Sequence, residues 1–224
     1  MKKLALLAAL ALPLCLPQTA WPQTANAFRL AAARQANGNL MKRYGWESRT
    51  QISVQGEVKD TRVDSLGYGP DGTLQRNNMS DQQAAVRGLF LRHLIAAVNK
   101  QELEQYLTGL RGVLEQYTLA SAGAIQTFLN RAVASGPNSQ GLYQMTGNGV
   151  VQPGDVYTLW FNPQTRKPTS IQVSTNYDGG PVTLNATFRT IGPDGLNYVE
   201  FANINVPAKQ INVQVSNYNY YRKF

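Results

Sequence analysis

The chain has 224 residues and a formal net charge of +8, from 21 Lys and Arg against 13 Asp and Glu. Hydrophobic residues make up 43% and charged residues 15%, a balance that supports one domain with a real core and excludes intrinsic disorder. The single Cys and the single His cannot build a Cys/His zinc site and leave little material for a His-dependent nucleophile. Composition therefore disfavours most hydrolase and metal chemistries. We predict no catalytic residue, no metal and no cofactor.

Residues 1–27 have the pattern of a secretory signal peptide. Two lysines follow Met1, residues 4–16 form an apolar stretch, and a small-x-small cleavage site ends at Ala27. The apolar stretch is shorter than the roughly 20 residues that a membrane-spanning helix needs. We therefore expect cleavage, a periplasmic protein without a transmembrane segment, and one mature domain over residues 28–224.

The predicted signal peptide also affects two further questions, membrane anchoring and the net charge of the mature chain. Cys15 follows Leu14, whereas a lipoprotein signal requires a small residue before its Cys, so anchoring through Cys15 is disfavoured. Cleavage removes two lysines and lowers the net charge from +8 to +6. Export and the scattered placement of the positive residues argue against nucleic acid as a partner.

The first half of the mature chain predicts a helix followed by strands. Residues 28–43 have a modest helical pattern that Gly38 interrupts, and residues 46–76 alternate as strands do. Gly56 allows a bend within this region, and Pro70-Asp71-Gly72 is a strong turn signal.

Residues 81–135 predict a helical insert. Ser80 with Gln83, and Asn99 with Glu102, have the spacing of a capping box at a helix start. A stripe with helical spacing follows in residues 103–117, and a third helical piece continues to Val133. The glutamates of this insert fall on the polar side of the stripe, which indicates a solvated face rather than acid and base catalysis.

The rest of the chain, from Gly141, predicts a meander of short strands. The clearest pair alternates over residues 171–177 and again over 182–188, with a Gly-Gly turn between. Both apolar sets can share one face of an antiparallel hairpin, while the other face carries Gln, Ser, Asn and Thr. A sheet with one apolar face needs a cover. We expect an α+β fold in which a curved antiparallel sheet wraps around the helical insert.

This layout resembles the LolA/LolB-like lipoprotein carriers of the bacterial envelope. The segments that carry the resemblance are LYQMTGNGVV, VYTLWFNPQTRKPTSIQVSTNYDG and GPVTLNATFRTI. The resemblance implies an unclosed β-barrel with an N-terminal helix and a central helical lid. It also implies a non-enzymatic carrier that holds a lipid, the acyl chains of a lipoprotein or another hydrophobic ligand in a cavity between sheet and lid.

The predicted cavity lining is apolar and comes from both the strands and the helical insert. Its predicted residues are Trp46, Ile52, Val54, Leu89, Phe90, Leu94, Trp160, Ile171, Val173, Leu184 and Phe188. For Trp46 and Trp160, a place in an ordinary dry core is equally consistent with the sequence.

Two alternatives stay open at this stage. One is a structural envelope protein that docks a protein partner and holds no small ligand. The other is an outer-membrane barrel, because the chain ends in an aromatic segment with a terminal Phe224. Arg222 and the helical insert fit a transmembrane barrel poorly.

Overall fold

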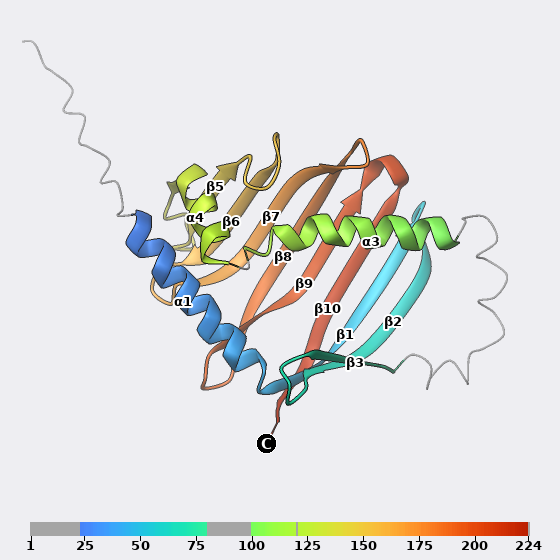
Figure 1. Ribbon diagram of the computed structural model, residues 1–224, viewed down its shortest axis with the longest axis horizontal. Helices are drawn as coiled ribbons and strands as arrows, with labels where there is room; N and C mark the ends of the chain where they lie inside the picture. Colours follow the sequence, from blue (N-terminus) through green and yellow to red (C-terminus); the bar gives the residue numbers. More distant parts are fainter. Residues whose placement is uncertain (1–22, 80–99, 120, 224) are drawn as a thin grey trace, which may run out of the picture.

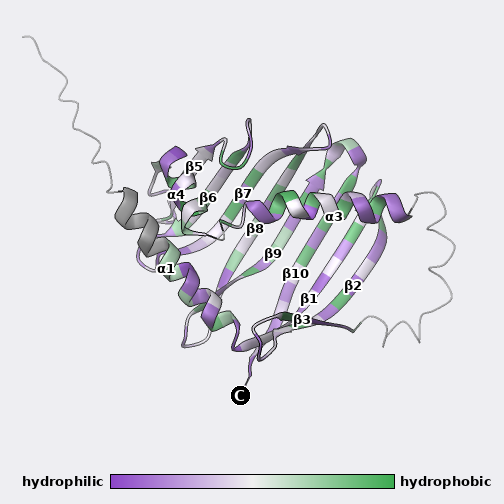
Figure 2. Ribbon diagram, viewed as in Figure 1, coloured by the Kyte–Doolittle hydropathy of each residue, from purple (hydrophilic) through white to green (hydrophobic). Residues whose placement is uncertain are grey.

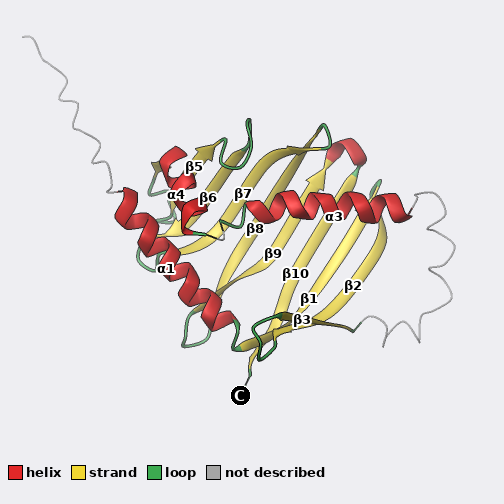
Figure 3. Ribbon diagram, viewed as in Figure 1, coloured by secondary structure: helices red, strands yellow, loops and turns green. Residues whose placement is uncertain are grey.

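Residues 23–79, 100–119 and 121–223 are described by a computed structural model (Figure 1). Most of the predicted signal peptide lies outside these residues, so it stays a prediction, as does the domain boundary at residue 28. In the described part of the chain, one antiparallel sheet carries helices on a single face (Figure 3). We call this the inner face. The predicted α+β class with an unclosed, curved antiparallel sheet and an N-terminal helix is confirmed.

The described helices are α1 (Gln23–Met41), α3 (Lys100–Gln116) and α4 (Ala122–Arg131). The strands are β1 (Tyr44–Val54), β2 (Glu57–Tyr68), β3 (Leu74–Asn78), β4 (Ala132–Ser135), β5 (Tyr143–Asn148), β6 (Val156–Asn162), β7 (Lys167–Tyr177), β8 (Gly180–Ile191), β9 (Leu196–Val206) and β10 (Ile211–Arg222). None of the described helices is long and apolar enough to cross a membrane.

The sheet joins two meanders through its last strand. Its order is β3-β2-β1-β10-β9-β8-β7-β6-β5-β4, so the C-terminal strand β10 lies between β1 and β9. The predicted hairpin is confirmed, because Thr175 pairs with Val182 and Tyr177 with Gly180. The open edges are β3 and β4, which keeps the sheet from closing.

Helix α3 lies across the inner face, over the strands from β8 to β1 (Figure 1). Leu110 and Leu114 are 2% and 8% exposed, as the predicted stripe requires, while Glu102 and Glu104 are exposed as predicted. Burying one apolar stripe is the main source of stability for such a helix. The sheet therefore positions α3, and α3 in turn covers one end of the sheet.

The predicted helical insert over residues 81–135 is wrong at its end. Helix α4 stops at Arg131, and residues 132–135 form β4, which pairs with β5. Val133 had been expected on the helix; it is instead 72% exposed on the edge strand. Residues 80–99, which contain the first part of the predicted insert, lie outside the described residues.

Candidate ligand-binding face

Strand register places apolar side chains of four neighbouring strands in two rows on the inner face. The row nearer α3 runs from β7 to β10 through Val173, Leu184, Ile204 and Val213. The row beside it runs through Ile171, Ala186, Ala202 and Val215. Residues two apart on a strand share a face, so both rows lie on the same side of the sheet.

Part of this apolar surface is only half-buried. We define the inner strip as its half-buried members together with Phe188, which follows Ala186 by two positions on β8. The inner strip is Ile171, Leu184, Phe188, Ala202, Ile204 and Val215. These side chains keep contact with solvent although they belong to the face on which the core is built.

Two packed clusters cover the surface on either side of the inner strip. Under α3, Leu110 packs with Val182 and Val206. Under α4, Phe128 is 0% exposed and packs with Tyr157, with ring centroids 4.9 Å apart in an edge-on arrangement. Leu184 packs against both clusters, so the inner strip joins the two parts of the core.

The opposite face of the same strands is polar. One row runs straight across five strands through Gln172, Asn185, Asn203, Gln214 and Gln51. The amide of Asn212 donates to Oδ1 of Asn203 at 2.8 Å. Hydropathy alternates along strands such as β8 and β10 (Figure 2), and this confirms the predicted sheet with one polar and one apolar side.

In the middle of β1 and β2, between Trp46 and Ile52, the inner face is polar and charged. Ser48 and Asp64 pair across the strands and are 5% and 1% exposed. The Asp64 carboxylate accepts a hydrogen bond from Arg62 Nε at 2.7 Å and lies 3.6 Å from Arg76 Nε. A buried carboxylate is tolerated when such partners satisfy it. The apolar rows of β7–β10 therefore give way to ion-paired and polar residues only in the middle of β1 and β2.

The structure separates the predicted cavity residues into distinct groups. Ile52, Ile171, Leu184 and Phe188 are half-buried on the inner face, while Val54 and Val173 are 6% and 0% exposed inside the two clusters. The remaining predicted residues lie elsewhere. These are Trp46 in an aromatic stack, Trp160 on the outer face, and Leu89, Phe90 and Leu94 outside the described residues.

Trp46 belongs to a ladder of aromatic rings at one end of the sheet. Its ring stacks on Tyr220 with centroids 5.7 Å apart and an interplanar angle of 4°. Tyr220 in turn lies 3.9 Å from Tyr198, and Trp46 lies 6.2 Å from Tyr68. Burial raises the pKa of the Tyr220 hydroxyl, so its ring stays neutral in this apolar setting. These rings pack against one another and fill this end of the inner face.

Trp160 faces away from the inner strip. Tyr157, Leu159 and Phe161 on β6 contact the core cluster under α4, and Trp160 alternates with them. Its neighbours in register are Gln144 and Ser170, both on the polar face. We therefore leave Trp160 out of the candidate site.

Three members of the inner strip were not predicted from sequence: Ala202, Ile204 and Val215. The signal was present, because Ala202, Ile204 and Val206 alternate with asparagines at 203 and 205. The same alternation holds for Ile211, Val213 and Val215 on β10. Period-2 alternation marks one buried and one wet face.

Comparisons with known proteins give structural matches without sequence matches. No protein-family model matches the sequence, and no curated protein matches it as a relative. The chain is similar in structure to a DUF1329 family protein from Desulfovibrio piger, with 11% identity, a TM-score of 0.42, and 89% of this chain and 93% of that chain covered.

Two further structures are similar at the same level. A domain described as an outer membrane lipoprotein-sorting protein from Vibrio parahaemolyticus has 9% identity, a TM-score of 0.40, and 89% and 93% coverage. A LolA superfamily protein from Nitrosomonas europaea has 7% identity, a TM-score of 0.36, and 88% and 94% coverage. The superfamily that the sequence resembles is thus named among these matches. These three TM-scores lie below 0.5.

Proposed function

We propose that this protein is an exported, non-enzymatic carrier that binds acyl chains or another hydrophobic ligand on the inner strip. The observation that carries the proposal is the register of half-buried apolar side chains across β7–β10, flanked by the two packed clusters. Ile204 and Val215 remain half-buried on the inner face and pack against the cluster under α3.

The energetics suit a flexible apolar guest. Burying apolar surface contributes about 25 cal/mol per Å², or roughly 0.8 kcal/mol for each methylene. An acyl chain that buries eight methylenes on the inner strip would gain about 6 kcal/mol, before the cost of association and ordering. Such binding is non-directional. A carrier of this kind recognises the length and the hydrophobicity of its ligand rather than a pattern of hydrogen bonds.

The placement of the helices supports reversible access. Helix α3 lies across the inner face (Figure 1) and packs on Val182, Val206 and Ile211, and three members of the inner strip, Leu184, Ile204 and Val215, pack against this cluster. Ligand release would need only a shift of α3 relative to the sheet, with no change in strand pairing. The proposed location is the periplasm, which the predicted signal peptide supports.

The proposal is tested by asking whether the purified protein carries and exchanges lipid. The protein, expressed with its own leader, is extracted with organic solvent and the extract is analysed by mass spectrometry. A fluorescent fatty acid is then titrated and displaced with unlabelled palmitic acid. Co-purified lipid and saturable displacement are expected. The absence of both would overturn the proposal and leave a structural envelope protein as the better interpretation.

A variant pair separates specific binding from adsorption. Ile204→Asn with Val215→Asn places two amides on the inner strip, while Asn203→Asp with Gln214→Glu changes the polar face directly behind it. We expect only the first pair to weaken displacement, because both pairs lie on the same strands and differ in the face they alter.

A further inference from the structure

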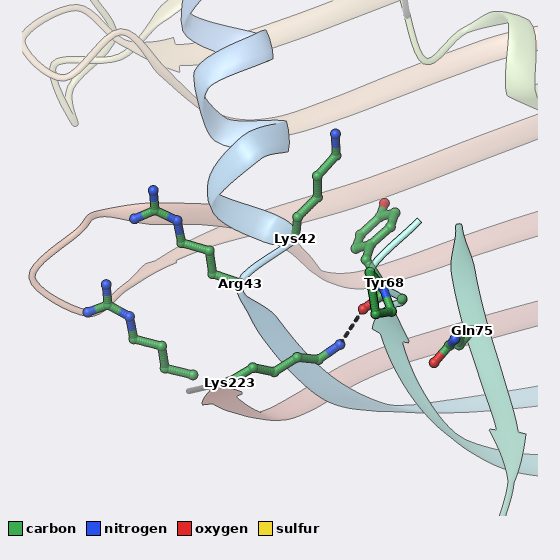
Figure 4. A pocket seen from close by; sticks show the side chains of 8 residues that line it. Lys42, Arg43, Tyr68, Gln75 and Lys223 are labelled. Carbon is green, nitrogen blue, oxygen red and sulfur yellow. Dashed lines mark hydrogen bonds between the residues drawn. The ribbon is translucent and has the colours of Figure 1, made fainter. Parts of the chain in front are cut away.

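Four basic residues from distant parts of the chain meet at one depression. It has a volume of about 640 Å³ and opens to solvent. Lys42 and Arg43 come from the junction of α1 and β1, and Arg222 and Lys223 from the end of β10. The β2–β3 hairpin supplies the opposite wall, with Tyr68 and Gln75 (Figure 4). None of the residues that line the depression is acidic.

Lys223 is held in place rather than free in solvent. Its backbone N–H donates to the carbonyl of Arg43 at 2.7 Å, and its Nζ donates to the carbonyl of Tyr68 at 2.7 Å. A side chain at Gly67 would collide with Lys223, since a Cβ there would lie 2.5 Å from Nζ. Glycine at position 67 therefore lets the lysine lie flat against β2. One of the three ammonium donors is used, which leaves the others available to a ligand.

The other basic residues of the depression differ in whether an acidic side chain lies close enough to neutralise them. Arg222 lies 3.5 Å from the Asp194 carboxylate, and Asp71 in the hairpin turn accepts hydrogen bonds from Thr73. Lys42 and Arg43 form no ion pair with any of the residues that the structure describes. In Figure 4 Lys42 extends upward beside the Tyr68 ring, the Lys223 ammonium lies below that ring at the Tyr68 carbonyl, and Arg43 points away from both. The excess charge is therefore positive and is carried by Lys42 and Lys223 on two sides of Tyr68.

We propose that this depression binds a phosphate group, either the headgroup of an anionic phospholipid or a free phosphate ester. The Lys223 ammonium and the Gln75 amide offer several donors to an anion with three or more acceptor oxygens, Lys42 adds positive charge on the other side of Tyr68, and lysine is a frequent phosphate ligand. Arg222 is partly neutralised by Asp194, and the depression is wide and open to solvent. Both features suit an anionic group larger than a carboxylate. This inference goes beyond the carrier proposal and does not rest on it.

The test compares charge removal inside and outside the depression. Lys42→Gln with Lys223→Gln removes two charges from the site, and Arg49→Gln with Arg166→Gln removes two charges from exposed positions elsewhere. The probes are vesicles of phosphatidylglycerol, vesicles of phosphatidylcholine, and glycerol phosphate measured by equilibrium dialysis at about 0.15 M salt. Each lysine is expected to contribute about fivefold to binding of an anionic membrane surface.

The expected result is at least a tenfold loss for the site variant and less than a twofold loss for the control. Loss on phosphatidylglycerol vesicles alone identifies a lipid headgroup, and loss on glycerol phosphate identifies a free ester. Equal losses of binding in both variants would show that only the net charge of the protein matters, and this would overturn the inference. The absence of binding to any probe would overturn it too. Lys42→Gln alone covers the case in which Lys223→Gln impairs folding, because Lys42 is exposed.

Discussion

The hydroxyl of Tyr117 donates a hydrogen bond to Oδ2 of Asp155 over 2.8 Å, and both residues are 1% exposed. Tyr117 directly follows α3, and its hydroxyl also lies 2.7 Å from Oγ1 of Thr175 on β7. The Asp155 carboxylate accepts three further bonds from the backbone N–H groups of residues 150–152. A single buried network therefore ties the end of α3 to the sheet and to the loop before β6.

Removing the Tyr117 hydroxyl tests how much this network stabilises the fold. Tyr117→Phe keeps the ring, which stacks near Tyr157, and deletes only the two hydrogen bonds. We expect the free energy of unfolding to fall by about 1–3 kcal/mol, because Asp155 and Thr175 lose a buried partner. Urea unfolding measures the change. Tyr221→Phe, at a 53% exposed tyrosine, serves as control and should cost less than about 0.5 kcal/mol.

Asp155 predicts a loss of stability in acid. Burial acts to raise the pKa of its carboxyl, but the hydrogen bonds from residues 150–152 and from Tyr117 outweigh burial and lower the pKa below its ordinary value. The charged form is thus favoured by folding. Its contribution is fully present above the ordinary Asp pKa of about 3.9, and it is lost as pH falls through the lowered folded pKa.

Asp155→Asn isolates this contribution. The amide keeps one acceptor oxygen and loses the charge, so we expect about 2–4 kcal/mol lower stability at neutral pH. Between about pH 5 and pH 2 the stability of this variant should depend less steeply on pH than that of the natural chain. Parallel slopes for the two proteins would refute the assignment.

Two glycines on α3 give a matched pair for the packing of this helix on the sheet. A Cβ at Gly109 would overlap the hydroxyl of Tyr177, whereas a Cβ at Gly112 meets nothing within 4 Å. Either Gly→Ala change gains up to about 1 kcal/mol of helix propensity. We expect Gly112→Ala to stabilise the protein and Gly109→Ala to lie at least about 1 kcal/mol below it in thermal or urea unfolding. Equal gains would show that Tyr177 does not hold α3 in place.

Sequence periodicity was sufficient to predict the sheet and the buried stripe of α3, because both follow from a local pattern of apolar and polar residues. It failed for residues 132–135, where pairing with the next strand, β5, overrides a local helical pattern. The network of Tyr117 with Asp155 has no periodic signal at all. It arises only when α3 meets the loop before β6.

In the candidate site, too, some features follow from local alternation in the sequence and others arise only from tertiary contacts. The size of Trp160 favours a place in the cavity lining, yet its position along β6 places it beside Ser170 on the polar face. Ile204 and Val215 could have been found from alternation alone. The basic depression could not, since Lys42, Lys223 and the β2–β3 hairpin come together only through the placement of β10 beside β1.

Variants of two phenylalanines on opposite faces of neighbouring strands distinguish ligand binding on the inner strip from nonspecific adsorption of lipid to the protein. Phe188 belongs to the inner strip, and Phe201 lies on the polar face, where it pairs with Thr187 and Ser216. Phe188→Ala should weaken fatty-acid binding about five- to tenfold, because it removes apolar contact of roughly 1–1.5 kcal/mol. Phe201→Ala should leave affinity within about twofold. Titration with a fluorescent fatty acid measures both, and a reversed order would place the ligand on the other face.

The most direct measurement of where a lipid sits is photo-crosslinking with a diazirine analogue of palmitic acid, followed by peptide mass spectrometry. The account predicts adducts on β7–β10 at inner-strip residues such as Ile204 and Val215, which disappear when unlabelled palmitic acid is added in excess. Adducts confined to the polar face around Asn203, or adducts that unlabelled lipid does not compete away, would contradict it.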